Sequence, residues 1–510
     1  MSHVKCLLVF CCLSLGILTC NSPSGLSDWE ASPAYIYVYQ KKDKPLTIDK
    51  GKLETNYSTL NRILRKHKVD RFFSSWPNAE APALQNIYEM HFAGFQGNIE
   101  ALERDLAASN LFEKVEVARY YQAEGKIVNR PGITSDPSTI SSCPTPEPPV
   151  NDIYTANGWT NNYALTLMEA ECAWTITKGD PSIVVGIADT EFDEDHEDLV
   201  NQFATVWGTV PPECDHGSLV AGCVSPETNN GLGIAGVGYN TKIAGYRVPH
   251  NYVPSYGCTG NPWPGVWQAY QEGRQIINVS WTGVGSATPS APQPGGVVMA
   301  VQEMVDNGTI LVLGAGNSPT STSHSSYANI PGVINVSGVD ANNEHAGTNH
   351  AHNQWVDLCA LSINVSTTSA SGNYVGGWGT SFAAPQVAGV AALILAVNPC
   401  LTPAEVEDVL KSTTDPINDS SSFLGGLGTG RLNAYKAVRK AATLCVEYQN
   451  ITTDSEYESY ILCTRDIELS NNAELKLNAI KELQIFDSFI VNAGTTLKIN
   501  VDGNYQLDCN

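Results

Sequence analysis

Short runs of apolar residues alternate with amphipathic stretches through the middle of this chain. Strand-like runs rich in valine, isoleucine and leucine lie at residues 183–188, 242–248, 276–280, 310–314 and 333–336. Strands that are apolar on both faces are typical of a parallel sheet with helices on either side. The apolar run at 387–397 predicts one of the buried helices. The pattern therefore predicts an α/β fold over residues 151–444.

The residues before this region carry a different pattern. Segments that favour strand, helix, strand, strand, helix and strand follow one another at 34–39, 57–67, 69–76, 87–92, 98–109 and 115–121. This order is the ferredoxin-like plan, so residues 21–124 are predicted to form a separate α+β domain. The next segment, 125–150, is rich in proline and serine. We interpret it as an exposed linker, where proteolytic nicking would concentrate.

The last part of the chain, residues 445–510, alternates apolar and polar positions with the period of strands. Strand-like stretches lie at 466–469, 473–477, 483–490 and 495–501. They predict a small all-β domain that carries no recognisable chemistry. Two roles remain open for it: association with a surface or target, and shielding of the preceding domain.

The amino terminus has the pattern of an export signal. Lys5 precedes an apolar run at 7–18, which is too short to span a bilayer as a helix, and residues 1–20 are predicted to be a signal peptide. The chain is therefore expected to be secreted or extracellular, without a transmembrane segment. Residues 17–20, ILTC, resemble a bacterial lipobox, so a cell-surface lipoprotein anchored at Cys20 is the alternative to simple secretion.

Composition narrows the classes of partner. The 510 residues suit two or three domains, and 42% of them are hydrophobic, which supports a sizeable core. Lys and Arg number 29 against 52 Asp and Glu, a formal net charge of −23. Such an acidic excess argues against nucleic acid or an anionic membrane surface as a partner.

Cysteine usage fits an exported protein. Of 14 cysteines, four lie in or beside the signal, and an even number remains, which predicts disulfide bridges. Cys214 and Cys223 flank His216, a pattern that could also indicate a metal site or a reactive thiol. Bridging is favoured because no Cys-x-x-Cys pair accompanies them, but the connectivity cannot be read from one sequence.

Candidate catalytic residues follow the predicted strands and helices. Ser381 opens the buried helix, Asp189 ends the strand-like run at 183–188, and His216 opens the segment HGSLVAG. In a parallel sheet the carboxyl ends of the strands meet at one edge, so these side chains can converge as nucleophile, acid and base. Asn317, after the run at 310–316, could donate to an oxyanion. Singly, each could be a helix cap or a turn residue; together they predict nucleophilic catalysis.

These segments resemble the subtilisin-like serine peptidases from about residue 151 to 442. The likeness rests on the segments that contain Asp189, His216 and Asn317, on GTSFAAP around Ser381, and on GTGRLNA at 428–434. It implies an endopeptidase that cleaves proteins or peptides through an acyl-enzyme at Ser381, needing no cofactor for the chemistry. The competing interpretation is a catalytically inactive binding protein with the same fold.

The resemblance also implies a role for the N-terminal domain. Its strand and helix order is similar to that of the family's propeptide, an intramolecular chaperone and inhibitor. Parallel sheets pair distant segments and fold slowly, which gives a physical reason for such a helper. The alternative is an unrelated secreted α+β domain.

Positions that the family uses for substrate binding can be matched as well. Ser280, Trp281 and Thr282 resemble one edge of the cleft, and Gly314 and Gly316 are expected to form the other. Thr282 stands where the family commonly has glycine, so the substrate preference cannot be carried over.

Two further departures from the family pattern occur near the candidate acid and base. Glu191 replaces a glycine in a tight turn, which puts the local turn geometry in doubt. Leu219 replaces a second histidine that is not the base.

A structural calcium ion is a further expectation from the resemblance. Asp198 and Asn230 match positions that supply oxygen ligands in the family. Calcium needs six to eight oxygens, most of them backbone carbonyls that a sequence does not reveal. The alternative is that both are solvated loop residues. His196 is expected to be a surface residue, neither base nor ligand.

Overall fold

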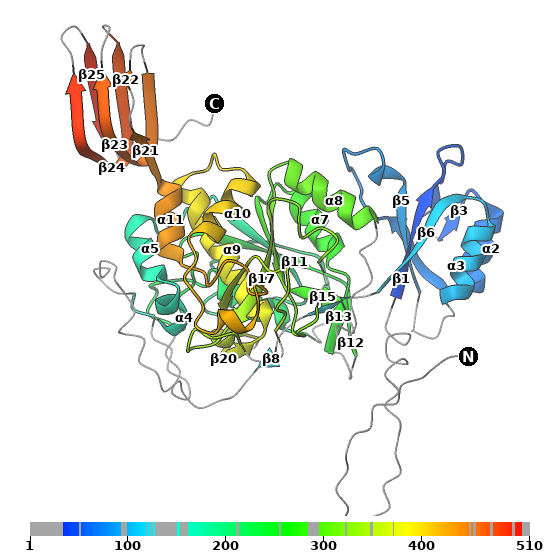
Figure 1. Ribbon diagram of the computed structural model, residues 1–510. Coiled ribbons are helices and arrows are strands. Elements are labelled where there is room, and N and C mark those ends of the chain that lie inside the picture. The colour runs from blue at the N-terminus through cyan, green and yellow to red at the C-terminus, as the bar shows by residue number, and fades with distance from the viewer. Residues whose placement is uncertain are drawn as a thin grey trace, which may run out of the picture.

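The structure is a computed structural model of the chain. It describes residues 34–49, 53–92, 99–119, 121–123, 126–127, 150–152, 162–210, 214–253, 257–283, 295–321, 324–346, 350–370, 372–447, 450–451, 455–469, 473–491 and 495–501. The predicted signal peptide, Cys20 and most of the predicted linker lie outside these residues. An N-terminal unit, a large central domain and a C-terminal sheet follow one another along the chain (Figure 1).

A seven-stranded parallel sheet forms the centre of the large domain. Its strands, in spatial order, are β10 (Phe203–Trp207), β11 (Lys242–Arg247), β9 (Val184–Asp189), β14 (Ile276–Val279), β16 (Ile310–Gly314), β17 (Val333–Val339) and β18 (Leu358–Leu361). Every neighbouring pair is parallel. The apolar runs recognised in the sequence are strands of this sheet, which confirms the predicted α/β class. Strands buried on both faces leave the longest apolar runs.

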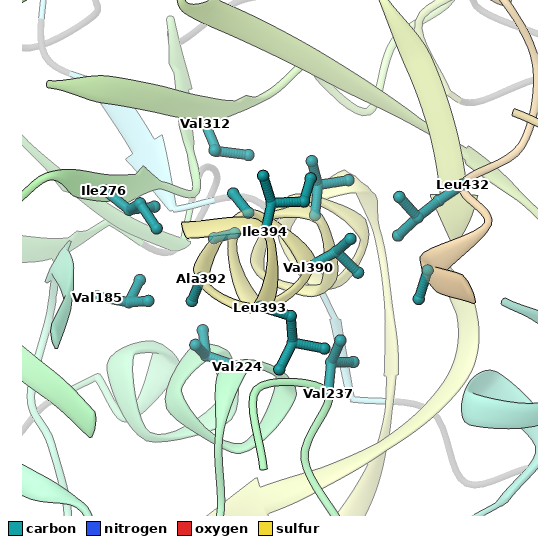
Figure 2. Close-up of a cluster of buried hydrophobic side chains, with 14 of the residues drawn as sticks. Val185, Val224, Val237, Ile276, Val312, Val390, Ala392, Leu393, Ile394 and Leu432 are labelled. Atoms are coloured by element: carbon teal, nitrogen blue, oxygen red, sulfur yellow. The ribbon is translucent and has the colours of Figure 1, made fainter. Parts of the chain in front are cut away.

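Helices cover both faces of this sheet. One face packs against α5 (Ala170–Ile176), α6 (His216–Val224), α9 (Thr380–Val397), α10 (Pro403–Ser412) and α11 (Ala434–Ala442). The other packs against α7 (Trp263–Gln271) and α8 (Gly295–Asp306). Figure 2 shows α9 at the centre of the first core, with Val390 and Ile394 among side chains from strands and neighbouring helices. Among the described residues, α9 is the one helix long and apolar enough to cross a membrane, and 94% of it is buried inside the fold.

Shorter elements surround the edge of the sheet where the strands end. They are α4 (Asn162–Leu167), the hairpin β12 (His250–Val253) and β13 (Gly257–Gly260), strand β15 (Trp281–Gly283), and the hairpin β19 (Ile363–Ser369) and β20 (Asn373–Trp378). The β20 strand leads directly into α9. These elements therefore frame the start of the central helix.

The N-terminal unit has the predicted order of elements. It consists of β1 (Ala34–Gln40), α2 (Ser58–Lys66), β4 (Val69–Ser74), β5 (Ile87–Phe92), α3 (Ile99–Ala108) and β6 (Phe112–Arg119), with a small β2 (Ile48–Asp49) and β3 (Glu54–Thr55) ladder. The strands form an antiparallel sheet in the order β4-β5-β1-β6, and the helices pack on one face.

The other face of this unit packs on α7 and α8 of the large domain. The rings of Trp76 and Trp267 meet edge to face at 5.3 Å, and the indole of Trp267 donates to the carbonyl of Pro77 at 2.9 Å. The Glu303 carboxylate on α8 accepts the backbone N–H groups of Glu80 and Ala81 at 3.0 and 2.9 Å. The contact is both apolar and specific.

Two short strands after β6 enter the large domain. β7 (Tyr121–Ala123) lies between β13 and β15 and pairs antiparallel with both. β8 (Lys126–Ile127) pairs antiparallel with β20. Residues 126–127 of the segment interpreted as an exposed linker are therefore strand, which corrects that interpretation for these two residues. A strand of two residues is too short to leave a periodic pattern.

The C-terminal unit contains β21 (Thr443–Glu447), β22 (Asn450–Ile451), β23 (Ser455–Leu469), β24 (Glu474–Val491) and β25 (Thr496–Val501). All of its strand pairs are parallel. Ser455 faces Leu475 and Glu474 faces Thr496, so the chain returns to the same end of the sheet after about one strand length and its connection. The stretches in β24 and β25 and at the end of β23 were recognised in the sequence, but β21, β22, most of β23 and the parallel pairing were not.

The cysteines only partly follow the prediction of bridges. Cys214 and Cys258 form a disulfide, and Cys172 and Cys400 are also disulfide-bonded. Cys223 and Cys359 are free and buried, so for these two residues the prediction was wrong. A buried thiol packs as a small apolar group, and an even count cannot distinguish that role from bridging.

Candidate active site

The candidate acid lies at the end of β9, near the middle of the parallel sheet. Asp189 is fully buried. Its Oδ1 accepts the backbone N–H of Thr190 at 2.7 Å, and its main-chain carbonyl accepts that of Val248 at 2.8 Å. These bonds hold the carboxylate in one orientation. The sheet edge therefore presents a buried anion whose direction is set by the backbone.

The candidate base faces this carboxylate. His216 is the first residue of α6, is 6% exposed, and its Nδ1 lies 2.9 and 3.1 Å from the two carboxylate oxygens of Asp189. Because a carboxylate can only accept, Nδ1 carries the hydrogen and Nε2 is the ring atom able to take a proton. Thr190 also accepts the N–H of Gly217 at 2.9 Å, which ties the two loops together.

Ser381 lies in the first turn of α9. The helix begins after Gly379, whose φ of 135° requires glycine. Pro385, four residues beyond Ser381, has no N–H, so the Ser381 carbonyl lacks its helical donor. The hydroxyl of Ser280 supplies that bond at 3.0 Å, and the Ser280 carbonyl accepts the Ser381 hydroxyl at 3.3 Å. Asn278 donates to the same Ser280 hydroxyl at 3.0 Å. The serine is thus positioned by the end of β14.

The start of α9 also contacts the candidate base. The ring of Phe382, next to Ser381, meets the ring of His216 edge to face at 6.3 Å. The structure therefore bonds Asp189 to His216 directly and brings the first turn of the serine helix against the imidazole. All three residues are buried at the same edge of the sheet.

Asn317 approaches the same helix start from β16. Its Oδ1 accepts the backbone N–H of Thr380 at 2.9 Å, so the side-chain oxygen is committed and the NH2 end is the donor. The Thr380 hydroxyl in turn accepts the N–H of Gly316 at 3.1 Å. Gly316 has a φ of 114°, and a Cβ there would lie 2.3 Å from the Ser321 hydroxyl, so no other residue fits. A Cβ on Gly314 would press on Thr380 at 3.2 Å.

Trp281 and Thr282, expected from the sequence at one edge of the cleft, belong to strand β15. Trp281 and Thr282 are buried and pair through their backbones with Ala123 and Gln122 of β7. The indole of Trp281 donates to the Ala188 carbonyl at 3.0 Å, so its side chain is bonded to the strand that ends at Asp189.

The second strand beside β7 is β13, which sequence reasoning missed. Thr259 and Gly260 of β13 pair with Gln122 and Tyr121. The sequence GCTG has neither alternation nor an apolar run that would have revealed a strand. Gly314 and Gly316, the residues expected at the other edge of the cleft, lie where β16 meets the start of α9.

The departures at Glu191 and Leu219 are accommodated. Glu191 is not among the non-glycine residues with positive φ, so its side chain imposes no left-handed strain. Its carboxylate pairs with Arg247 at 2.5 Å. Leu219 is 4% exposed and belongs to an apolar cluster beneath the site.

The expected calcium ligands do not form an oxygen cage. The carboxylate of Asp198 accepts the side-chain amide of Asn230 at 2.9 Å and the backbone N–H of Ile234 at 2.8 Å. The Asn230 oxygen itself accepts the N–H of Leu232 at 2.7 Å. No group of three His, Cys, Asp or Glu side chains that could hold a metal occurs within the described part of the chain. Because N–H groups occupy the oxygens that calcium would need, the residues do not fit this ion.

His196, beside this loop, is not a surface residue. It is 1% exposed, its Nδ1 accepts the N–H of Asp198 at 3.1 Å, and its Nε2 faces the Asn373 carbonyl at 3.0 Å. The expectation from the sequence was therefore wrong, because the imidazole links the loop to β20.

We expect calcium not to change the contribution of the loop containing Asp198 to the melting temperature. The melting temperature should fall in Asp198→Asn, since one oxygen acceptor becomes an N–H donor facing donors. The fall should be the same with added calcium and with EGTA. Thermal unfolding of wild type and variant under both conditions measures this, and Asp195→Asn, at an exposed carboxylate, is the control. A difference that depends on calcium would contradict the hydrogen-bonded assignment.

Buried histidines near the cleft predict loss of stability in acid. Burial lowers the pKa of His324 to about 4 and that of His350 to about 3. Both values lie below the ordinary 6.5, so the unfolded chain binds more protons as pH falls. The contribution is complete above pH 6.5 and is lost below it, at about 1 kcal/mol per pH unit for each histidine. Urea unfolding at pH 7, 6 and 5 should show this fall, and the fall should be smaller in His350→Phe. Equal stability at all three pH values would contradict it.

The geometry defines a class: an α/β protein of the serine peptidase type, with a buried acid and imidazole bonded at the mouth of the helix that carries the serine. The subtilase family model matches residues 180–437, about half of the sequence. The chain belongs to the subtilase family.

Sequence similarity to two known proteins supports the assignment of the chain to this family. The chain is 30% identical over 274 residues to a thermophilic serine proteinase of Bacillus sp. (strain AK1), covering 52% of this chain and 64% of that protein. It is 25% identical over 379 residues to subtilisin amylosacchariticus of Bacillus subtilis subsp. amylosacchariticus, covering 71% and 93%.

A solved structure shares the fold. Fervidolysin from Fervidobacterium pennivorans, a keratinolytic enzyme related to subtilisin, superposes with a TM-score of 0.54 at 20% identity, over 80% of this chain and 61% of that one. The chain therefore spans less than two thirds of the length of fervidolysin and of the Bacillus proteinase.

Proposed function

We propose that the protein is a secreted serine endopeptidase that hydrolyses peptide bonds through an acyl-enzyme at Ser381. The observation that carries the proposal is the hydrogen bond between Asp189 and His216. The imidazole lies against the first turn of α9, the helix that holds Ser381. Membership of the subtilase family supports it independently.

Each residue has a distinct task in the proposed reaction. Nε2 of His216 takes the proton from the Ser381 hydroxyl as the oxygen attacks the carbonyl, and later gives it to the leaving amine. Asp189 fixes the tautomer and stabilises the imidazolium that forms. The acyl-enzyme is then hydrolysed by water, with His216 again acting as base.

The oxyanion is proposed to bind between the NH2 group of Asn317 and the backbone N–H of Ser381. We expect Asn317→Ala to lower kcat by about 100- to 1000-fold with little change in KM, because the donor acts on charge that develops in the transition state. Steady-state kinetics on a peptide anilide measures this, and Ser318→Ala next to it is the control. An unchanged kcat would remove Asn317 from the mechanism.

The N-terminal unit is proposed to act as a propeptide that occupies the cleft until it is cut off. β7 fills the position between β13 and β15 that an extended substrate would take as an added strand. The apolar contact around Trp76 and Trp267 would hold it there.

The registers on the two sides of Ser381 point to one bond for this maturation. On one side, Ala123 pairs with Trp281, the residue directly after Ser280, and the Ser280 carbonyl accepts the Ser381 hydroxyl. On the other side Lys126 faces Trp378. Glu124 and Gly125 themselves lie outside the described residues. The bond between them is the one we propose is cleaved, within the molecule, by Ser381.

Sequencing the amino terminus of the secreted protein tests the maturation site. Wild type should yield a chain beginning at Gly125, and Ser381→Ala should keep the N-terminal unit covalently attached. An active wild-type enzyme that retains the unit, or one cut elsewhere, would refute the proposed bond. A mass of the intact Ser381→Ala chain would also reveal a lipid at Cys20 if the protein is anchored rather than freely secreted.

A fluorophosphonate probe tests the activity against the competing interpretation, an inactive binding protein. It should label Ser381 of matured wild type and not Ser381→Ala, because only an activated hydroxyl attacks the phosphorus. Failure to label matured wild type would favour the binding protein, for which the C-terminal strands would be the surface or target module.

A further inference from the structure

One disulfide joins the side of the active site that carries the proposed base to the side that binds the substrate backbone. Cys214 is 5% exposed and lies two residues before His216. Its main-chain carbonyl accepts the N–H of Glu191, two residues after Asp189, at 3.2 Å. The loop at Cys214 is therefore fixed to the acid as well as to the base.

The partner cysteine lies in the strand that sequence reasoning missed. Cys258 belongs to β13 and faces Tyr252 of β12 in the hairpin. The next two residues of β13, Thr259 and Gly260, pair with β7. Tyr252 is 57% exposed, so the hairpin is at the surface of the molecule. The Cα atoms of the two cysteines are 6.2 Å apart.

When β7 leaves, β13 loses its hydrogen-bonded neighbour on one side. Neighbouring strands lie about 4.8 Å apart, so removing β7 leaves β13 and β15 separated by about 10 Å, too far for ladder hydrogen bonds between them. A substrate strand restores both ladders only if this spacing is kept. The disulfide is a covalent support for β13 that persists when the cleft is empty.

We propose that the Cys214–Cys258 disulfide is a positioning element that holds the β13 edge at the spacing an extended peptide requires and aligns it with His216. This inference rests on the proposed function. In the register of β7, residues 121 and 122 face β13, and residue 124 would precede the cleaved bond. Substrate residues three and four positions before the bond therefore depend on the disulfide, whereas the residue at the bond does not.

Substrates of different length distinguish this positioning role of the disulfide from a general role in stability. The matured double variant Cys214→Ser/Cys258→Ser is compared with wild type on a tetrapeptide anilide and on an acylated single-residue ester. We expect KM for the tetrapeptide to rise about tenfold and KM for the ester to stay within about twofold, with kcat little changed for both, because the lost interaction serves binding and not chemistry. Cys223→Ala, at a free buried cysteine of α6, is the matched control.

Reduction of matured wild type gives a second measurement that does not depend on folding of the variant. Dithiothreitol should raise the tetrapeptide KM while sparing the ester, and the double variant should not show this additional rise. An unchanged ratio of the two KM values, or an equal loss for both substrates, would overturn the inference. Wild type that hydrolyses neither substrate would instead refute the proposed function.

Discussion

Replacing Ser381 by alanine is expected to lower kcat by about a million-fold, the largest effect of any single change in this chain. The variant keeps the fold, because Ser381 contributes to the core only through its backbone and a small side chain that alanine can replace. Its carbonyl still accepts the Ser280 hydroxyl. KM, or the affinity for an uncleaved peptide, should therefore change little once an added active enzyme has removed the N-terminal unit. Rates on a peptide anilide, with thermal unfolding in parallel, measure both.

Ser318→Ala is the matched control for this change, since it removes a hydroxyl from the neighbouring loop. It should retain wild-type activity. Residual activity of Ser381→Ala near the wild-type level would show that another residue is the nucleophile. Loss of the unfolding transition in Ser381→Ala would mean that the hydroxyl is needed for folding, and the fluorophosphonate result on wild type would then carry the assignment.

Asp189→Asn is expected to lower kcat by about ten thousand-fold near neutral pH. The amide can donate as well as accept, so it no longer requires the hydrogen on Nδ1 of His216, and Nε2 loses its role as base. The size of the side chain is preserved, and its oxygen can still accept the N–H of Thr190. We therefore expect the melting temperature to change much less than kcat. Rates and thermal unfolding, measured on protein processed by an added active enzyme, separate the two.

Asp195→Asn serves as the control for Asp189→Asn because it makes the same chemical change at an exposed carboxylate of the following loop. It should leave kcat within about twofold of wild type, as expected of a surface substitution. A similar loss in both variants would indicate that the region responds to net charge. A small loss in Asp189→Asn would contradict the orienting role of the carboxylate.

The sequence predicted those strands and helices whose burial produces a recognisable pattern of apolar residues. The strands β9, β14 and β16 are apolar on both faces, and each appeared as a continuous run. Asp189 was singled out because it ends such a strand, and His216 because it opens a helical segment. The carboxyl ends of parallel strands meet at a common edge, where the two side chains can converge. The order of strands and helices in the N-terminal unit was also predicted, because the buried residues of these elements leave apolar positions at strand or helix spacing.

Several features at the site left no such pattern. β13 and β7 are short inner strands of a four-stranded sheet, stabilised by backbone pairing, and pairing does not depend on side-chain identity. The support that Ser280 gives to Ser381 follows from the missing donor at Pro385, and only the contact between β14 and α9 reveals it.

The bonds of Asp198 and Asn230 and the burial of His196 were not foreseen for a related reason. Their side chains were assigned by likeness, but the hydrogen bonds that they make depend on which donors the neighbouring loop presents. A carboxylate that accepts two N–H groups and a carboxylate that binds calcium look the same in a sequence.

The order of amino acids determined the α/β class, the strand ends and the candidates for acid, base and nucleophile, because burial and chemistry depend on side-chain type. The three-dimensional packing established which strand lies beside β7, which cysteines bridge and which carbonyl receives which donor. These are relations between segments distant along the chain, and they arise from backbone geometry that many sequences would share.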